Sequence, residues 1–176
     1  MTAITRTPIN PNPLHSNKFT LNFGRLPSVQ YFCQSATIPG LTIAEVNQNT
    51  PFIDLYVPGE KLIYDTFDIS FIVDEDLTSW KEIHDWIRAM TFPENFDEYK
   101  NLGRLAKNIS SNKTPQYSDA ILQLYTAAYN PSYKIKLYDC FPISLSSIPL
   151  SAMDSPDNIL TIDASFRFAY YDIEKN

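Results

Sequence analysis

The stretch that decides the fold begins with Phe67-Asp68-Ile69-Ser70-Phe71-Ile72-Val73. Phe67, Ile69, Phe71 and Val73 fall at alternate positions and share one face, which predicts a β-strand with that face buried. The carboxylates at 74–76 end the strand, because a run of charges is not buried. Apolar residues then recur every three or four positions and predict an amphipathic helix, with Ser79 and Glu82 spaced as a capping box at its start. Its apolar stripe is expected to contain Leu77, Trp80, Ile83, Ile87 and Met90.

Other segments of the chain also show strand patterns. We expect the first two to form a hairpin, and the last, which is unusually long, to serve two sheets or to bend between them. The expected strands are 19–23, 29–36, 119–127, 133–138 and 159–173, and a second, short helix is expected at 94–106. The predicted fold class is mainly β with one firm α-helix (α+β): an antiparallel β-sandwich or half-open barrel with a flanking helix.

The predicted domain organisation is one β domain, 18–176, after an extended, proline-containing arm, 1–17. Residues 91–117 are polar and are expected to form an insertion. Residues 41–61 hold more apolar side chains than a solvated loop. Two interpretations are open for this segment: an ordinary core hairpin, or a projecting hairpin that lies on a neighbouring subunit. The second interpretation gives Phe52, Ile53, Leu55, Tyr56 and Val57 as candidate contacts between subunits or between rings.

Composition argues against several classes of protein. The formal net charge of −6 gives no electrostatic footprint for gripping nucleic acid or anionic lipid. The chain has four glycines and no glycine-rich phosphate loop. Cys33 and Cys140 lie in apolar, strand-like segments and are expected to be buried free thiols. Residues 1–17 do not resemble a signal peptide, and no apolar run has membrane-spanning length, so we expect a soluble protein made in the cytosol.

The side chains that commonly carry chemistry form no catalytic or metal-binding pattern. His84 lies at the edge of the helical apolar stripe, which favours a histidine with a hydrogen-bonded ring over a ligand or base. The carboxylates at 74–76 precede a helix, where the helix dipole favours acids. The serines at 144, 146 and 147 stand in no Gly-x-Ser-x-Gly turn. We therefore expect that the protein is not an enzyme and that it binds no cofactor and no metal ion.

Several stretches occur in an order that resembles one known family. They are Phe32–Gly40, Val57–Lys61, Tyr64–Phe71 running into the helix of Trp80, and Ile135–Pro142 before the long last strand. Together they resemble the tail tube proteins of contractile-tailed bacteriophages, over most of 19–173. The resemblance implies a structural virion protein, assembled in the host cytoplasm, whose hexameric rings stack into a tube that encloses a channel for DNA ejection.

The resemblance also implies a set of partners. They are other copies of the chain, the tail sheath protein, the baseplate or tube initiator, the tail terminator, and the tape-measure protein and transiting double-stranded DNA in the lumen. No specific DNA binding and no membrane are expected. Six copies carry about −36 charges per ring, and an acidic wall repels phosphates rather than trapping them.

Two further questions stay open at this level. The two strands with the clearest alternation each carry polar residues opposite their apolar face. These residues either face the lumen or form an ordinary solvated sheet face; they are Asp68, Ser70, Asp163 and Ser165. For function, the alternatives to a repeating tube subunit are a tube initiator or another tube-like baseplate component, and, from a different class, a monomeric soluble β-barrel binding module.

Overall fold

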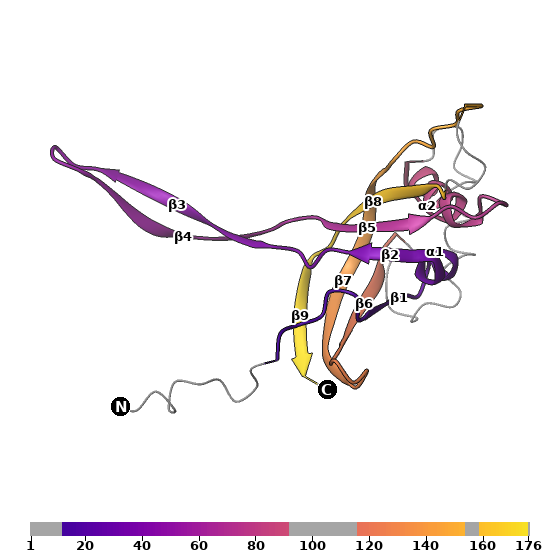
Figure 1. Ribbon diagram of the computed structural model, residues 1–176. Coiled ribbons are helices and arrows are strands. Elements are labelled where there is room, and N and C mark those ends of the chain that lie inside the picture. The colour runs from indigo at the N-terminus through magenta and orange to yellow at the C-terminus, as the bar shows by residue number, and fades with distance from the viewer. Residues whose placement is uncertain (1–11, 92–115, 154–158, 176) are drawn as a thin grey trace.

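The computed structural model describes residues 12–91, 116–153 and 159–175 (Figure 1). The predicted helix at 94–106, most of the predicted insertion and most of the predicted arm lie outside these residues. The described chain runs β1 (Phe19–Phe23), α1 (Pro27–Phe32), β2 (Cys33–Ala36), β3 (Leu41–Asn49), β4 (Asp54–Tyr64), β5 (Phe67–Ile72), α2 (Thr78–Thr91), β6 (Ser118–Tyr125), β7 (Pro131–Leu145), β8 (Thr161–Arg167) and β9 (Tyr170–Lys175).

The strands of the body form one bent antiparallel sheet in the order β1-β6-β7-β8-β5-β2, with β9 also paired to β7. The first part of β7 pairs with β6 and β9, and residues 141–145 pair with β8. Between these parts Asp139 has a φ of 54°, in the left-handed region, which redirects the strand. Its amide donates a hydrogen bond to the Asp119 carboxylate at 3.1 Å. The predicted class, mainly β with antiparallel strands and a flanking helix, is confirmed, with α1 as an additional helix.

The long last strand divides between the two parts of the sheet, as its length predicted. Strand β8 pairs with β5 and with the end of β7, whereas β9 pairs with the start of β7. At the break between them, the Ala169 amide donates to the Tyr138 carbonyl at 2.9 Å. One continuous segment therefore crosses the bend and ties both parts together.

The strand predicted at 29–36 is wrong in its first half. Residues 29–32 belong to α1, and β1 and β2 do not form a hairpin, because β1 pairs with β6 and β2 with β5. Pro27 occupies the start of the helix, where its fixed φ is already helical. Val29 is completely buried, and the hydroxyl of Ser28 donates to Glu82 of α2 at 2.8 Å. Packing against α2 outweighs the strand propensity of a short apolar run.

Helix α2 completes the core of the body. Ile83 and Trp86 are buried, and Trp80, Ile87 and Met90 pack against the core, whereas Leu77 is exposed just before the helix. The stripe predicted from spacing is therefore present except at its first residue, and it omits the large Trp86. That indole meets the Phe23 ring edge-on at 5.9 Å between centroids.

Strands β3 and β4 form a separate two-stranded ladder. Figure 1 shows it as a long hairpin that projects away from the body. Its side chains are almost all exposed, and only Tyr64 at its base packs against the core. The segment expected at 41–61 thus lies in a hairpin that continues to Tyr64.

Candidate assembly surfaces

The projecting hairpin carries the residues predicted as contacts between subunits. Phe52 is 94% exposed, and Ile53 and Tyr56 are 62% and 63% exposed. Leu55 and Val57 are exposed as well, and none of the five belongs to the core. Apolar side chains gathered at this density on one projecting element form a surface suited to covering by another chain.

The base of the hairpin is fixed to the body. The Tyr64 ring packs edge-on against Phe168 and Tyr171, with centroids 5.4 Å and 5.5 Å away. The Arg167 guanidinium donates to the Tyr64 carbonyl at 2.9 Å, and the Tyr171 hydroxyl donates to the Pro39 carbonyl at 3.3 Å. Strands β8 and β9 therefore set the direction in which the hairpin leaves the body.

Halfway along the hairpin the ladder is interrupted. The pairing is irregular between Ile43 and Glu45. At this point Gly59 approaches Ala44 so closely that a Cβ on Gly59 would lie 2.4 Å from the Ala44 carbonyl oxygen. The irregularity thus depends on a residue without a side chain.

The sheet of the body ends in strands with unpaired outer edges. Strands β1 and β2 stand at the two ends of the strand order, and β9 pairs with β7 alone. Within residues 12–91, 116–153 and 159–175, the outer edges of these three strands have no strand partner. Exposed edges present unpaired backbone N–H and C=O groups, so they are natural places for another chain to add its own strand.

The four candidate lumen residues lie together on one face of the β5–β8 pair. Asp68 is opposite Ser165, and Ser70 is opposite Asp163, so all four point to the same side. The Ser70 hydroxyl donates to the Asp163 carboxylate, and the Thr66 hydroxyl donates to Asp68 at 3.2 Å. The alternate residues of both strands fill the core. The structure therefore brings these four residues into one polar surface.

The acidic run 74–76 contributes the N-terminal cap of α2, and the predicted capping box does not form. The Asp74 carboxylate accepts hydrogen bonds from the amides of Thr78 (3.0 Å) and Ser79 (2.8 Å) and from the Ser79 hydroxyl (2.6 Å). Glu82 instead accepts from Ser28 of α1, because the helix begins at Thr78 rather than after Ser79. Burial raises the pKa of Asp74, but the hydrogen bonds from Ser79 and Thr78 outweigh it and hold that pKa well below its usual range.

His84, Cys33 and Cys140 make contacts with neighbouring side chains or lie partly or fully buried in the fold. The His84 ring stacks on Trp80 with centroids 4.9 Å apart, and its Nδ1 lies 3.1 Å from the Asp85 carboxylate. Cys33 and Cys140 are free thiols, Cys140 buried and Cys33 half-buried, and burial raises the pKa of Cys33 to about 11. Among the described residues, no three His, Cys, Asp or Glu side chains gather where they could hold a metal ion. No helix in the described ranges is long and apolar enough to cross a membrane.

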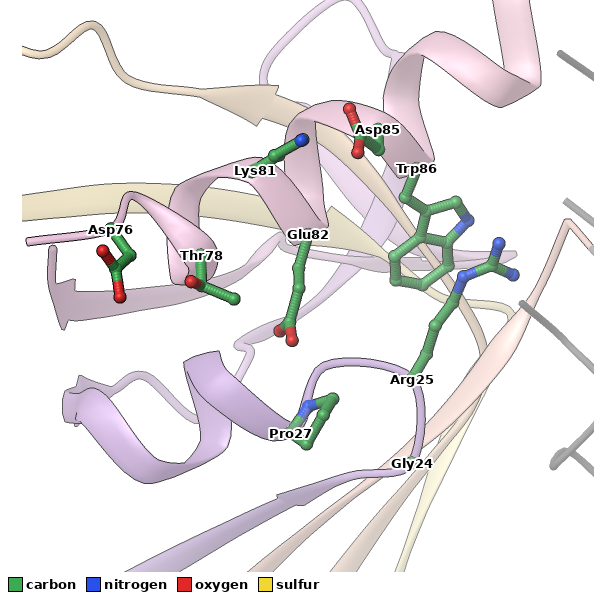
Figure 2. Close-up of a pocket in the computed structure, with 9 residues that line it drawn as sticks. All are labelled: Gly24, Arg25, Pro27, Asp76, Thr78, Lys81, Glu82, Asp85 and Trp86. Carbon is green, nitrogen blue, oxygen red and sulfur yellow. The ribbon is translucent and has the colours of Figure 1, made fainter. Parts of the chain in front are cut away.

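A pocket of about 540 Å³ lies between the β1–α1 connection and α2 (Figure 2). Arg25 extends along its wall, with the guanidinium 4.6 Å from the centroid of the Trp86 ring, and burial lowers the pKa of Arg25 to about 10. Glu82 reaches across to α1, where it binds Ser28. Sequence reasoning missed this pocket because its walls come from segments more than fifty residues apart. Among the lining residues, Glu82 joins α2 to α1 through its contact with Ser28.

Comparison with known proteins identifies relatives over nearly the whole chain. Residues 10–174 match the family described as phage tail tube protein. The tail tube terminator protein of Enterobacteria phage T4 is 27% identical over 168 residues, which cover 92% of this chain and 84% of that protein.

The fold also occurs in solved structures of other proteins. The tube terminating cap of the anti-feeding prophage has a TM-score of 0.57 at 14% identity, with both chains covered completely. A chain of the sheath–tube complex of the PVC extracellular contractile injection system has a TM-score of 0.55 at 12% identity, with 94% of both chains covered. Because the family match spans almost the whole sequence, the chain belongs to the phage tail tube protein family and is a structural protein of that family.

Proposed function

We propose that this chain forms the ring that ends the tail tube of a contractile-tailed phage. The observation that carries the proposal is the 27% identity with the T4 tail tube terminator protein across 92% of the chain. The likeness in fold to a tube terminating cap agrees with it. In this role the chain is a virion protein that assembles in the host cytoplasm into a hexameric ring and seats on the last ring of the tube.

The geometry of the chain supports assembly with copies of itself. The open edges of β1, β2 and β9 offer backbone groups to neighbours within a ring. Different surfaces meet in such a contact, and a heterologous contact that closes gives a ring. The hairpin tip, with Phe52 and Leu55, extends far enough from the body to lie on another subunit.

The proposed ring has defined neighbours. The tube protein lies beneath it, the sheath protein surrounds it, and the tape-measure protein and then double-stranded DNA pass through its lumen. The polar surface of Asp68, Ser70, Asp163 and Ser165 is our candidate for the lumen wall. The chain's formal net charge of −6 suits a passage through which DNA slides without specific binding.

The repeating tube subunit is the second candidate. The family match and the likeness in fold to a chain of a sheath–tube complex favour it. A repeating subunit stacks on both sides of its ring and lengthens the tube, whereas a terminator ring binds one tube end and stops growth. A tube initiator would bind a baseplate instead.

Electron microscopy separates these roles. The full chain is mixed with preassembled tubes of the tube protein from the same phage, and tube ends and lengths are compared with and without it. We expect discrete rings, one at the end of each tube, with no further growth when free tube protein is added. Longer tubes that contain the chain would establish the repeating subunit. A monomer at every concentration, even with tubes present, would contradict both roles and favour a monomeric binding module.

A further inference from the structure

The sheet of the body changes direction where β7 leaves β6 and β9 and joins β8. The part before this point holds β1, β6, β9 and the start of β7, and the part after it holds β2, β5, β8 and the end of β7. In Figure 1, β7 and β9 run down the view, whereas β5 and β2 run across it. The two parts therefore differ in strand direction, and the residues at the change set the angle between them.

These residues include a β-bulge. The register shifts between β6 and β7, so that Tyr138 and Asp139 lie opposite the single residue Asp119. An extra residue in one strand bends that strand and increases its twist. Asp139 takes up the bend with a φ of 54°, and the Ala169 amide donates to the Tyr138 carbonyl at 2.9 Å across the same point. We call these four residues the corner.

The conformation of Asp139 is costly, and its surroundings hold it in place. Glycine adopts a positive φ without strain, whereas other residues keep one only where the neighbouring structure imposes it. The Asp119 carboxylate accepts a hydrogen bond from the Asp139 amide at 3.1 Å, so this amide has a partner although the bulge leaves Asp139 without a residue directly opposite in β6. A strained backbone held by a surface side chain indicates that this particular angle is required.

The corner contributes little to the core. Asp119 and Ala169 are exposed, and Tyr138 and Asp139 are half-buried. The apolar residues that hold the sheet on the helices lie on both sides of the corner and are buried without it. The main contribution of the corner is therefore the direction of the strands.

The unpaired edges of the described strands lie in both parts of the sheet. The outer edge of β2 belongs to the part after the corner, and the outer edges of β1 and β9 belong to the part before it. Where an edge of one part meets an edge of the other part on the next copy, the angle between the parts fixes how far each copy is turned. Six copies close a ring at about 60° per copy, whereas five or seven require about 72° or about 51°. A change of roughly 10° at the corner would therefore change the number of copies.

We propose that the corner sets the number of copies in the ring, and that Asp119 acts by holding Asp139 in its left-handed conformation. The inference rests on the proposed function, in which the chain closes a ring whose symmetry matches the last ring of the tube. Asp119 and Asp139 are thus positioning residues: they determine the angle at which neighbouring copies meet.

Two pairs of variants test the corner. Asp139→Val opposes the left-handed conformation, because a β-branched residue is an outlier at positive φ, and Asp139→Gly is its control, because glycine adopts this φ freely. Asp119→Ala removes the acceptor of the Asp139 amide, and Asp119→Asn is its control, because its side-chain carbonyl still accepts a hydrogen bond.

The full-length chains are assembled without tube protein, so that a tube does not impose its own symmetry. Copies per ring are counted by native mass spectrometry and by top views in electron microscopy, and folding is followed by urea denaturation. We expect Asp139→Val and Asp119→Ala to fold, to form rings with a changed or mixed number of copies, and to bind preassembled tube ends at least tenfold more weakly. We expect both controls to form rings with the same number of copies as the unsubstituted chain.

Several results would overturn the inference. An unchanged number of copies in both test variants would remove the role of the corner, and an equal change in the controls would show that the conformation of Asp139 does not decide the number. Unfolding of both test variants would assign the corner to stability alone. Rings of the unsubstituted chain that form only on tubes would show that the tube sets the number. Failure of the unsubstituted chain both to form rings and to bind tubes would instead refute the proposed function itself.

Discussion

Replacing Asp74 by alanine is expected to destabilise the protein by about 2 kcal/mol, at the upper end of the range for losing a helix N-terminal cap. The carboxylate accepts three hydrogen bonds, from the amides of Thr78 and Ser79 and from the Ser79 hydroxyl. The loss is limited because the Ser79 hydroxyl also lies 3.3 Å from the Ile72 carbonyl and keeps that acceptor. In a chain of this size the change corresponds to a fall in melting temperature of about 4–8 °C.

The effect of Asp74 depends on pH in a defined direction. Its pKa in the folded protein lies below the value of 3.8 for an unperturbed aspartate. The charged carboxylate therefore stabilises the fold fully above the unfolded pKa, and this contribution is lost as the pH falls below about 4 toward the folded pKa. We expect the stability difference between the unsubstituted chain and Asp74→Ala to be largest at pH 7 and to shrink as the pH falls from 4 to 3.

Urea denaturation at several pH values measures this difference, with Glu75→Ala as the control. Glu75 is exposed in the same acidic run, so its removal is expected to change the free energy of unfolding by less than about 0.5 kcal/mol. Equal effects of Asp74→Ala and Glu75→Ala at pH 7 would refute the assignment of the cap. A difference that stays constant down to pH 3 would refute its electrostatic basis.

Three further substitutions test the core, the link between the helices and the hairpin. Phe166→Ala is expected to cost about 3–5 kcal/mol in urea denaturation, because this completely buried ring packs against Phe23 at 5.2 Å; a loss below 1 kcal/mol would contradict its central position. Glu82→Gln keeps an acceptor but removes the charge opposite Ser28, and is expected to cost about 1 kcal/mol, with Glu75→Gln as the control. Phe52→Asp is expected to leave the free energy of unfolding unchanged within about 0.5 kcal/mol while it weakens assembly; unfolding of the chain would assign the tip to the core.

Local periodicity determined much of the fold. Strict alternation identified β5 and the long last segment, and a spacing of three to four identified α2. The same period of two placed Asp68, Ser70, Asp163 and Ser165 on one face, because strand geometry fixes which side chains point together whatever the neighbouring strand is. The unusual density of apolar residues in 41–61 singled out the hairpin.

The remaining features depend on contacts between distant segments. Residues 29–32 are helical because Val29 is buried in the core and Ser28 donates a hydrogen bond to Glu82 of α2. Glu82 does not form the predicted capping box, because it accepts this bond from Ser28, 54 residues away. The apolar pairs across the hairpin, such as Val46 with Val57, depend on the register between β3 and β4, which the period along one strand does not specify. Periodicity along one strand specifies which residues share a side, whereas the tertiary structure decides which surface that side meets.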